Sequence, residues 1–363
     1  MTDKMKNILE SEHGKYLSLL ARLCDADGPS GFEDKIKDII IEEASPYADK
    51  LYIDRMGSVI VFKKGKIHPT RPIQFDAHMD EVGFIITAVT DEGYIKFESI
   101  GGVDAKVLPA KRVRIGDSSI PGVISSTPVH MQKGNAAGAP LSIKDMVIDF
   151  GAESKEDALK YVAVGDHICF DSDSFLFGDN DSFFKGKALD DRLGCFLMLN
   201  ALKEDLPYDT YFSFSVQEET GLRGAKTAAH QIKPYIGVAI DSTTAGDVDG
   251  VSGMNVVCRQ GEGGVISLAD GATVYEPEIV QKVMDAAKEK NIKAQYKLRA
   301  TGGNNAAALQ RMASGARVIA LSAPSRYIHS PSSTIKVSDI IEMQKLITLL
   351  IDILGEESYK KCN

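Results

Sequence analysis

The chain has 363 residues, of which 44% are hydrophobic and 26% are charged, and its formal net charge is -9. A chain of this length can bury a large core and suggests about two domains. The acidic balance, without any long basic block, argues against nucleic acid or an anionic membrane surface as a partner.

The patterning of the first half changes at about residue 82. Before that point, two helices, a hairpin and a short apolar strand are predicted at 15–24, 32–44, 51–62 and 73–77. From 82 to 181 the signals are short strands, at 82–90, 94–100, 113–115, 122–125 and 167–170, with a little helix near 154–161. We expect this stretch to be a small all-β module, most simply a barrel.

From about residue 188 the chain alternates helix and strand. Helices are predicted at 191–204, 222–232, 276–290, 304–313 and 338–354. Strands are predicted at 210–217, 236–241, 294–298 and 316–322. This alternation predicts an α/β domain around a mostly parallel or mixed sheet. Residues 1–80 plus 182–363 would form that domain, with 82–181 as an inserted all-β domain.

The cysteines and the N-terminus bear on location. The five cysteines are scattered and form no C-x-x-C pair, which fits reduced thiols better than a disulfide framework. The polar N-terminus lacks the apolar core of a signal peptide. No apolar run approaches the ~20 residues that a membrane span needs. We therefore expect a cytoplasmic protein.

The most informative histidine is His78, at the end of a predicted strand. Residues i and i+2 of a strand point to the same side, so Asp80 could reach the ring of His78. A carboxylate on the far ring nitrogen fixes the orientation of a metal-ligating histidine. The alternative is a surface ion pair at a strand end.

Three acidic groups and a second histidine also follow strands or begin helices. Asp190-Asp191 begins a predicted helix, where the acids could cap the helix or one could bridge two cations. Glu218-Glu219 follows an apolar strand, so one could bind a metal while the other accepts a proton. Asp241 also follows a strand, and His329 lies in the loop before the last helix. The order of these acids and histidines along the chain favours a two-metal site with one histidine and two carboxylates per metal, one carboxylate being shared. Such a ligand set suits zinc, cobalt or manganese.

Several runs, in this order, resemble those of the TET-type aminopeptidases, also known as the glutamyl aminopeptidase or cellulase-M-like metallopeptidases. The similarity extends over nearly the whole chain. The runs are G-P-S-G-F-E at 28–33, H-M-D-E-V-G at 78–83, G-G-V-D at 101–104, G-K-A-L-D-D-R at 186–192, Q-E-E at 217–219 and R-Y-I-H-S-P at 326–331.

The resemblance implies two divalent ions per subunit, zinc, cobalt or manganese. Asp190 would bridge the two ions, with Glu219 and His329 completing one site and His78 and Asp241 completing the other.

It also implies catalytic roles for Glu218 and Asp80. Glu218 would be the general base for a metal-bound hydroxide that removes N-terminal residues from short peptides, and Asp80 would orient His78. The Asp190–Asp191 peptide would be cis.

For the fold, the resemblance implies the α/β/α sandwich of metal-dependent exopeptidases with an inserted, PDZ-like β-barrel. In the family this barrel builds dimers, and six dimers close into a hollow tetrahedral dodecamer. We expect a homo-oligomer, at least a dimer, whose enclosed sites admit only short peptides.

The sequence departs from the family at residues 301–306, T-G-G-N-N-A, where a Gly-Gly-Thr-Asp-Ala-like stretch usually carries an acid. No metal ligand is lost, but the family's substrate preference does not carry over directly. Two alternatives remain: a deacylase or amidase with the same metal pair, and a catalytically idle assembly protein. A serine hydrolase is disfavoured because no G-x-S-x-G elbow occurs.

Overall fold

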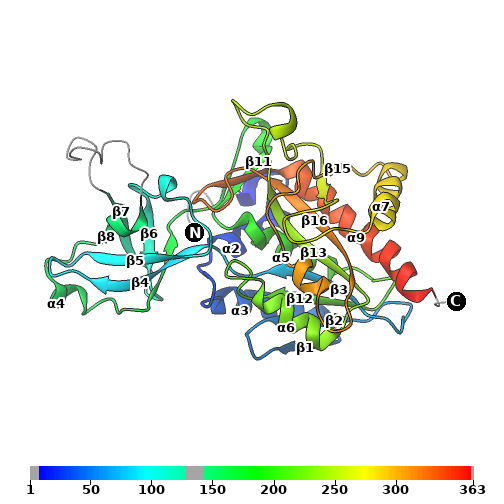
Figure 1. Ribbon diagram of the computed structural model, residues 1–363, viewed down its shortest axis with the longest axis horizontal. Helices are drawn as coiled ribbons and strands as arrows, with labels where there is room; N and C mark the ends of the chain where they lie inside the picture. The colour runs from blue at the N-terminus through cyan, green and yellow to red at the C-terminus, as the bar shows by residue number, and fades with distance from the viewer. Residues whose placement is uncertain (1–7, 127–141, 361–363) are drawn as a thin grey trace.

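The computed structural model describes residues 8–126 and 142–360. An eight-stranded sheet with its helices forms the larger part, and a closed six-stranded barrel extends from it (Figure 1). The large majority of the buried apolar side chains fall into two separate clusters, one in each part.

The large sheet is mixed, in the order β1-β2-β12-β3-β13-β16-β14-β15. Its strands are β1 (Lys50–Ile53), β2 (Val59–Lys63), β3 (Ile73–His78), β12 (Thr210–Ser215), β13 (Ile236–Thr244), β14 (Gly264–Ile266), β15 (Ala294–Tyr296) and β16 (Arg317–Ser325). The four central strands β12, β3, β13 and β16 are parallel. Every residue of β3 is buried, as expected for a parallel strand that is covered on both faces.

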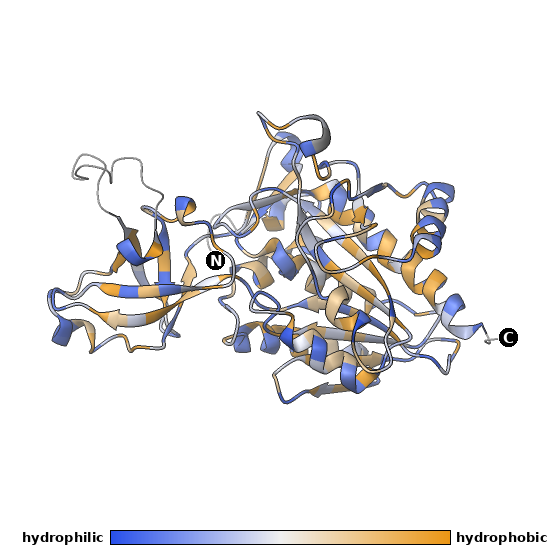
Figure 2. Cartoon of the chain, viewed as in Figure 1, coloured by the Kyte–Doolittle hydropathy of each residue, from blue (hydrophilic) through white to orange (hydrophobic). Residues whose placement is uncertain are grey.

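Helices cover both faces of this sheet. One layer contains α2 (Gly14–Asp25), α3 (Asp34–Ala44), α5 (Leu189–Ala201), α7 (Pro277–Glu289) and α9 (Val337–Tyr359). The other contains α6 (Arg223–Ile232) and α8 (Ala306–Gln310), which contact each other. Figure 2 shows that α9 is largely apolar, and its buried residues pack in the main core. The predicted α/β fold is confirmed.

The barrel strands follow the order β4-β5-β8-β7-β6-β9, and β9 closes on β4. They are β4 (Gly83–Val89), β5 (Ile95–Ile100), β6 (Arg112–Ile115), β7 (Ile120–Ser125), β8 (Val147–Asp149) and β9 (His167–Phe170), with the short helix α4 (Lys155–Ala158). Phe84 contacts Phe97 and Phe170 edge to face in the barrel core. These elements lie within 82–181; the division into two domains at those boundaries stays a prediction.

A small sheet that the sequence did not predict joins distant segments. It consists of β10 (Phe175–Phe177), β11 (Phe183–Gly186) and β17 (Ser333–Lys336). Because β11 precedes α5 directly and β17 follows the loop of His329, their pairing brings these two segments together.

Candidate metal centre

The candidate site lies at the carboxyl ends of the central parallel strands, where ligands bind in open α/β sheets. His78 is the last residue of β3 and lies opposite Ser215 of β12. Glu218 and Glu219 follow β12, and Asp241 lies on β13. All of the sequence-predicted residues meet here, because Asp190 at the start of α5 and His329 in the loop before β17 complete the group.

The two carboxylate oxygens of Asp190 face different histidines. His78 Nε2 lies 3.2 Å from Asp190 Oδ1 and 3.9 Å from Asp241 Oδ1. His329 Nε2 lies 3.3 Å from Asp190 Oδ2 and 3.1 Å from Glu219 Oε1. The donor atoms of each histidine and its two carboxylates lie within 4.8 Å of one another. Asp190 is therefore common to two groups of three donors. The peptide between Asp190 and Asp191 is cis, as expected.

The chemistry of this donor set fits divalent cations. Each group offers one imidazole nitrogen and carboxylate oxygens, the ligands that zinc, cobalt and manganese accept. Burial raises the pKa of Asp241 and of Glu219, and the charge of Asp190 raises both further. Three carboxylates and two histidines, all buried or half-buried, hold more negative than positive charge, which bound cations would neutralise.

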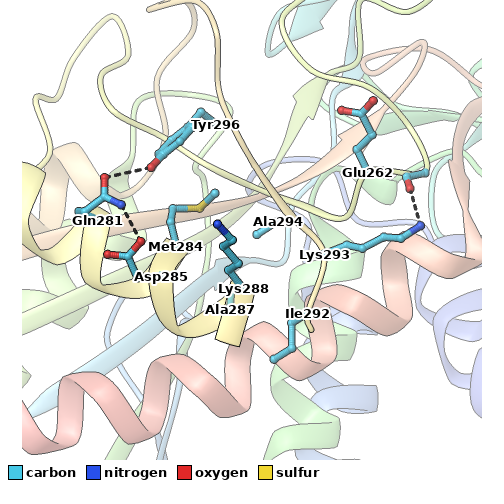
Figure 3. A pocket seen from close by; sticks show the side chains of 11 residues that line it. Glu262, Gln281, Met284, Asp285, Ala287, Lys288, Ile292, Lys293, Ala294 and Tyr296 are labelled. Atoms are coloured by element: carbon cyan, nitrogen blue, oxygen red, sulfur yellow. Dashed lines mark hydrogen bonds between the residues drawn. The ribbon is translucent and has the colours of Figure 1, made fainter. Parts of the chain in front are cut away.

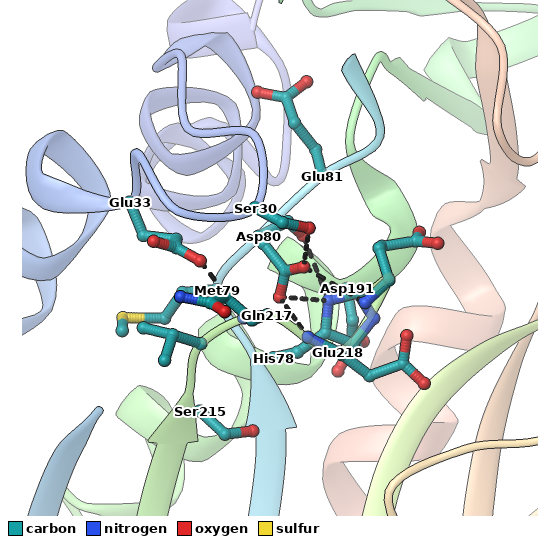
Figure 4. A network of polar contacts seen from close by, with 12 residues as sticks. Ser30, Glu33, His78, Met79, Asp80, Glu81, Asp191, Ser215, Gln217 and Glu218 are labelled. Atoms are coloured by element: carbon teal, nitrogen blue, oxygen red, sulfur yellow. Dashed lines mark hydrogen bonds and ion pairs between the residues drawn. The ribbon is translucent and has the colours of Figure 1, made fainter. Parts of the chain in front are cut away.

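Asp80 connects His78 to the loop that carries the two glutamates (Figure 4). His78 Nδ1 lies 3.0 Å from the Asp80 carbonyl oxygen and 3.4 Å from its carboxylate. The same carboxylate accepts the backbone N–H groups of Glu218 at 2.9 Å and Glu219 at 3.1 Å. Asp80 thus fixes the position of Glu218 and Glu219 as well as the ring of His78.

Two residues of the 28–33 run support the same loop, a role that sequence reasoning missed. Ser30 Oγ donates to Asp80 Oδ2 at 2.5 Å, and Glu33 Oε1 accepts the N–H of Gln217 at 3.1 Å. The only signal in the sequence was that both residues lie in a run shared with the resembled family.

Behind the site lies a network of buried ion pairs. Lys187 Nζ lies 2.6 Å from Glu81 Oε1 and 3.1 Å from Asp27 Oδ1. Arg114 of β6 contacts the same Asp27 oxygen at 2.6 Å, and Arg192 of α5 lies 3.4 Å from Glu81. Lys187, Arg114 and Arg192 together neutralise Asp27 and Glu81, so these two acids belong to an ion-pair network.

Two asparagines of the segment that departs from the resembled family, Asn304 and Asn305, are buried beneath the site. Asn305 Nδ2 donates to Asp76 Oδ1 at 2.7 Å and to Ser215 Oγ at 3.0 Å. Burial raises the pKa of Asp76 to about 6. Asn304 is directed to Asp270 and Tyr275. Asn305 therefore supports strands β3 and β12 from within the core.

Cavities lie both beside the site and far from it. One, with a volume of about 670 Å³, is lined by some of the residues in 102–111 and 327–332, among them His329. Another, of about 570 Å³, lies between α7 and β15 and contains no residue of the candidate site (Figure 3). No helix in the described ranges is both long and apolar enough to cross a membrane.

Comparison with known proteins decides the family, since the model of the M42 glutamyl aminopeptidases matches residues 57–346. The chain belongs to this family. A relative from Acetivibrio thermocellus, provisionally named an aminopeptidase, is 37% identical to this chain. The match covers 93% of this chain and 98% of the relative. The glutamyl aminopeptidase of Lactococcus lactis and the lysyl aminopeptidase of Pyrococcus furiosus are each 28% identical over 92% of this chain, and over 95% and 96% of their own.

Solved structures of similar proteins confirm the fold. A TET aminopeptidase from a marine-sediment thaumarchaeon has a TM-score of 0.91 at 32% identity, over 96% of this chain and 99% of its own. The Pyrococcus horikoshii TET1 peptidase has a TM-score of 0.80 at 33% identity, over 93% of this chain and 99% of its own. That peptidase can assemble into a tetrahedron or a large octahedral shell. The predicted enzyme class, an aminopeptidase that hydrolyses peptide bonds, is confirmed.

Proposed function

We propose that this M42 protein is a two-metal aminopeptidase that removes N-terminal residues from short peptides. The observation that carries the proposal is the position of Asp190, whose two carboxylate oxygens face His78 and His329 separately. Asp241 would complete the set around His78, and Glu219 the set around His329.

Two divalent ions held there would polarise the scissile carbonyl and acidify the attacking water. Glu218 lies beside His78 and Glu219, so its carboxylate would take the proton of that water and pass it to the leaving amine. Asp80 would position Glu218 through the backbone N–H that it accepts. A carboxylate beside the ions, Glu218 or Glu219, would pair with the ammonium group of the peptide.

Substitution of Glu218 by Gln tests this assignment. The amide keeps the size of the side chain but cannot accept the proton, so kcat should fall by about 10²–10⁴-fold while metal content and fold persist. Glu262→Gln, an exposed residue of the remote cavity, is the matched control. Wild-type turnover by Glu218→Gln, or no divalent ion bound after zinc or cobalt loading, would exclude this mechanism.

We also propose that the 82–181 stretch is an oligomerisation domain, and that the chain forms dimers and, from six dimers, a tetrahedral dodecamer. The assembly of the P. horikoshii relative supports this. Light scattering tests it, because a lone monomer of 39.3 kDa would exclude it. A chamber would also make short peptides better substrates than folded proteins. The relatives named for glutamyl and for lysyl substrates leave the preferred N-terminal residue open.

A further inference from the structure

The cavity beside His329 has one wall from the barrel and one from the α/β part. Its volume is about 670 Å³, and residues between Gly102 and Lys111 face residues between Tyr327 and Ser332. A Cβ added to Gly102 would lie 3.6 Å from Nδ1 of His329, which is ordinary van der Waals contact. The cavity therefore adjoins one of the proposed metal ligands, and a peptide bound at the metals has room to extend into it.

The described lining of this cavity holds more basic than acidic side chains. Lys106 and Lys111 line it, and neither ammonium forms an ion pair with any residue in 8–126 or 142–360. Asp104 is the one acid in the lining, and its Oδ1 accepts the N–H of Lys106 at 2.9 Å, which caps the short helix η2 (Ala105–Val107). A peptide whose ammonium group lies at the metal centre would therefore extend toward Lys106 and Lys111.

We infer that Lys106 and Lys111 bind a carboxylate of the peptide substrate, so that short anionic peptides are favoured over neutral ones. This inference rests on the proposed aminopeptidase function and names its substrate class. The carboxylate can come from the C-terminus of the peptide or from an acidic N-terminal side chain, and the substrates below distinguish the two sources.

The test compares kcat/KM at low ionic strength for Leu-Ala-Ala and its C-terminal amide, and for glutamyl and leucyl anilides. Wild type should prefer the free acid of the tripeptide by roughly two- to tenfold, because each exposed charge pair contributes modestly. Salt should reduce the preference. The Lys106→Gln/Lys111→Gln variant should bring the ratio to about 1. Asp104→Asn should raise it, since Asn keeps the helix cap without the opposing charge.

Lys155→Gln is the control, because Lys155 begins α4, which Figure 1 places at the end of the barrel remote from the α/β part. It should leave both ratios unchanged. If the double variant changes the glutamyl-to-leucyl ratio and not the acid-to-amide ratio, the carboxylate is that of the N-terminal side chain. Both ratios near 1 in wild type, with leucyl anilide still hydrolysed, would overturn the inference and leave the proposed function standing. No hydrolysis of any substrate by metal-loaded protein would overturn both.

Discussion

Lys187→Met removes the central cation of the buried ion-pair network. Lys187 Nζ lies 2.6 and 2.8 Å from the two oxygens of Glu81 and 3.1 Å from Asp27. Its side chain is fully buried, and burial alone would lower the pKa of the ammonium group. The negative charge of Glu81, together with smaller contributions that include Asp27, outweighs burial and raises this pKa. Methionine has similar length and no charge, so the variant leaves both acids without this partner.

The remaining partners set the size of the effect. Asp27 keeps Arg114 at 2.6 Å. Among residues 8–126 and 142–360, Glu81 keeps only the more distant Arg192, at 3.4 Å, and the N–H of Gly28 at 3.1 Å. Loss of one partner of a buried pair costs about 3–5 kcal/mol. Since both acids retain some compensation, we expect unfolding to become easier by about 3 kcal/mol, the lower end of that range.

Urea unfolding followed by circular dichroism, at one fixed protein concentration because the chain is expected to oligomerise, measures this difference. Lys203→Met is the matched control: its ammonium is 3.4 Å from Glu43, and its side chain is 33% exposed. That pair should contribute less than about 1 kcal/mol. Adding Glu81→Gln to Lys187→Met should recover part of the loss, because it removes the uncompensated charge. A loss for Lys187→Met no larger than for Lys203→Met would refute the reasoning.

Two further predictions concern Asp27 and Gly101. Burial would raise the pKa of Asp27, but Lys187 and Arg114 outweigh this and lower it. The ionised carboxylate therefore stabilises the fold above a pH of about 4, and this stabilisation is lost as the pH falls through the lowered pKa. The difference in free energy of unfolding between wild type and Asp27→Asn should therefore shrink in acid. A difference that does not change with pH would contradict this. Gly101 has φ +81° and an added Cβ would lie 2.9 Å from a Val82 methyl carbon, whereas Gly151 has φ +88° and no atom within 4 Å. Backbone strain should lower the free energy of unfolding of both alanine variants by about 1 kcal/mol. Crowding against Val82 should lower that of Gly101→Ala by about 1–3 kcal/mol more. Equal unfolding midpoints for the two variants would contradict this.

Much of the fold could be predicted because its long elements have clean apolar patterns. Helix α9 and strand β3 appear close to their expected ranges. Strands β8, β10 and β14 have three residues each and were not predicted, because so short a segment shows little periodicity; β15, equally short, was predicted only as part of a longer stretch, 294–298. The helix expected at 304–313 begins later, at Ala306 of α8, because the two asparagines before it bond inward to the core, and it ends at Gln310.

The residue types at the site could be predicted, but not their detailed contacts. Strand ends and acidic pairs indicated which side chains meet. No pattern indicated that the Asp80 carbonyl lies closer to His78 than the Asp80 carboxylate does. His329 has φ +57°, a conformation that is uncommon outside glycine and that only the surrounding structure can enforce.

The buried charges connect the barrel to the candidate metal centre. Glu81 follows Asp80 directly, while Lys187 and Arg192 flank Asp190 in the chain. Arg114, which belongs to the barrel, contacts Asp27 and through it Lys187. A shift of the barrel would separate Arg114 from Asp27 and weaken this buried pair, although Asp27 would keep Lys187 and Arg114 would keep Asp171. The same contacts therefore hold both walls of the cavity beside His329 in place, which is why its lysines can act as a fixed subsite.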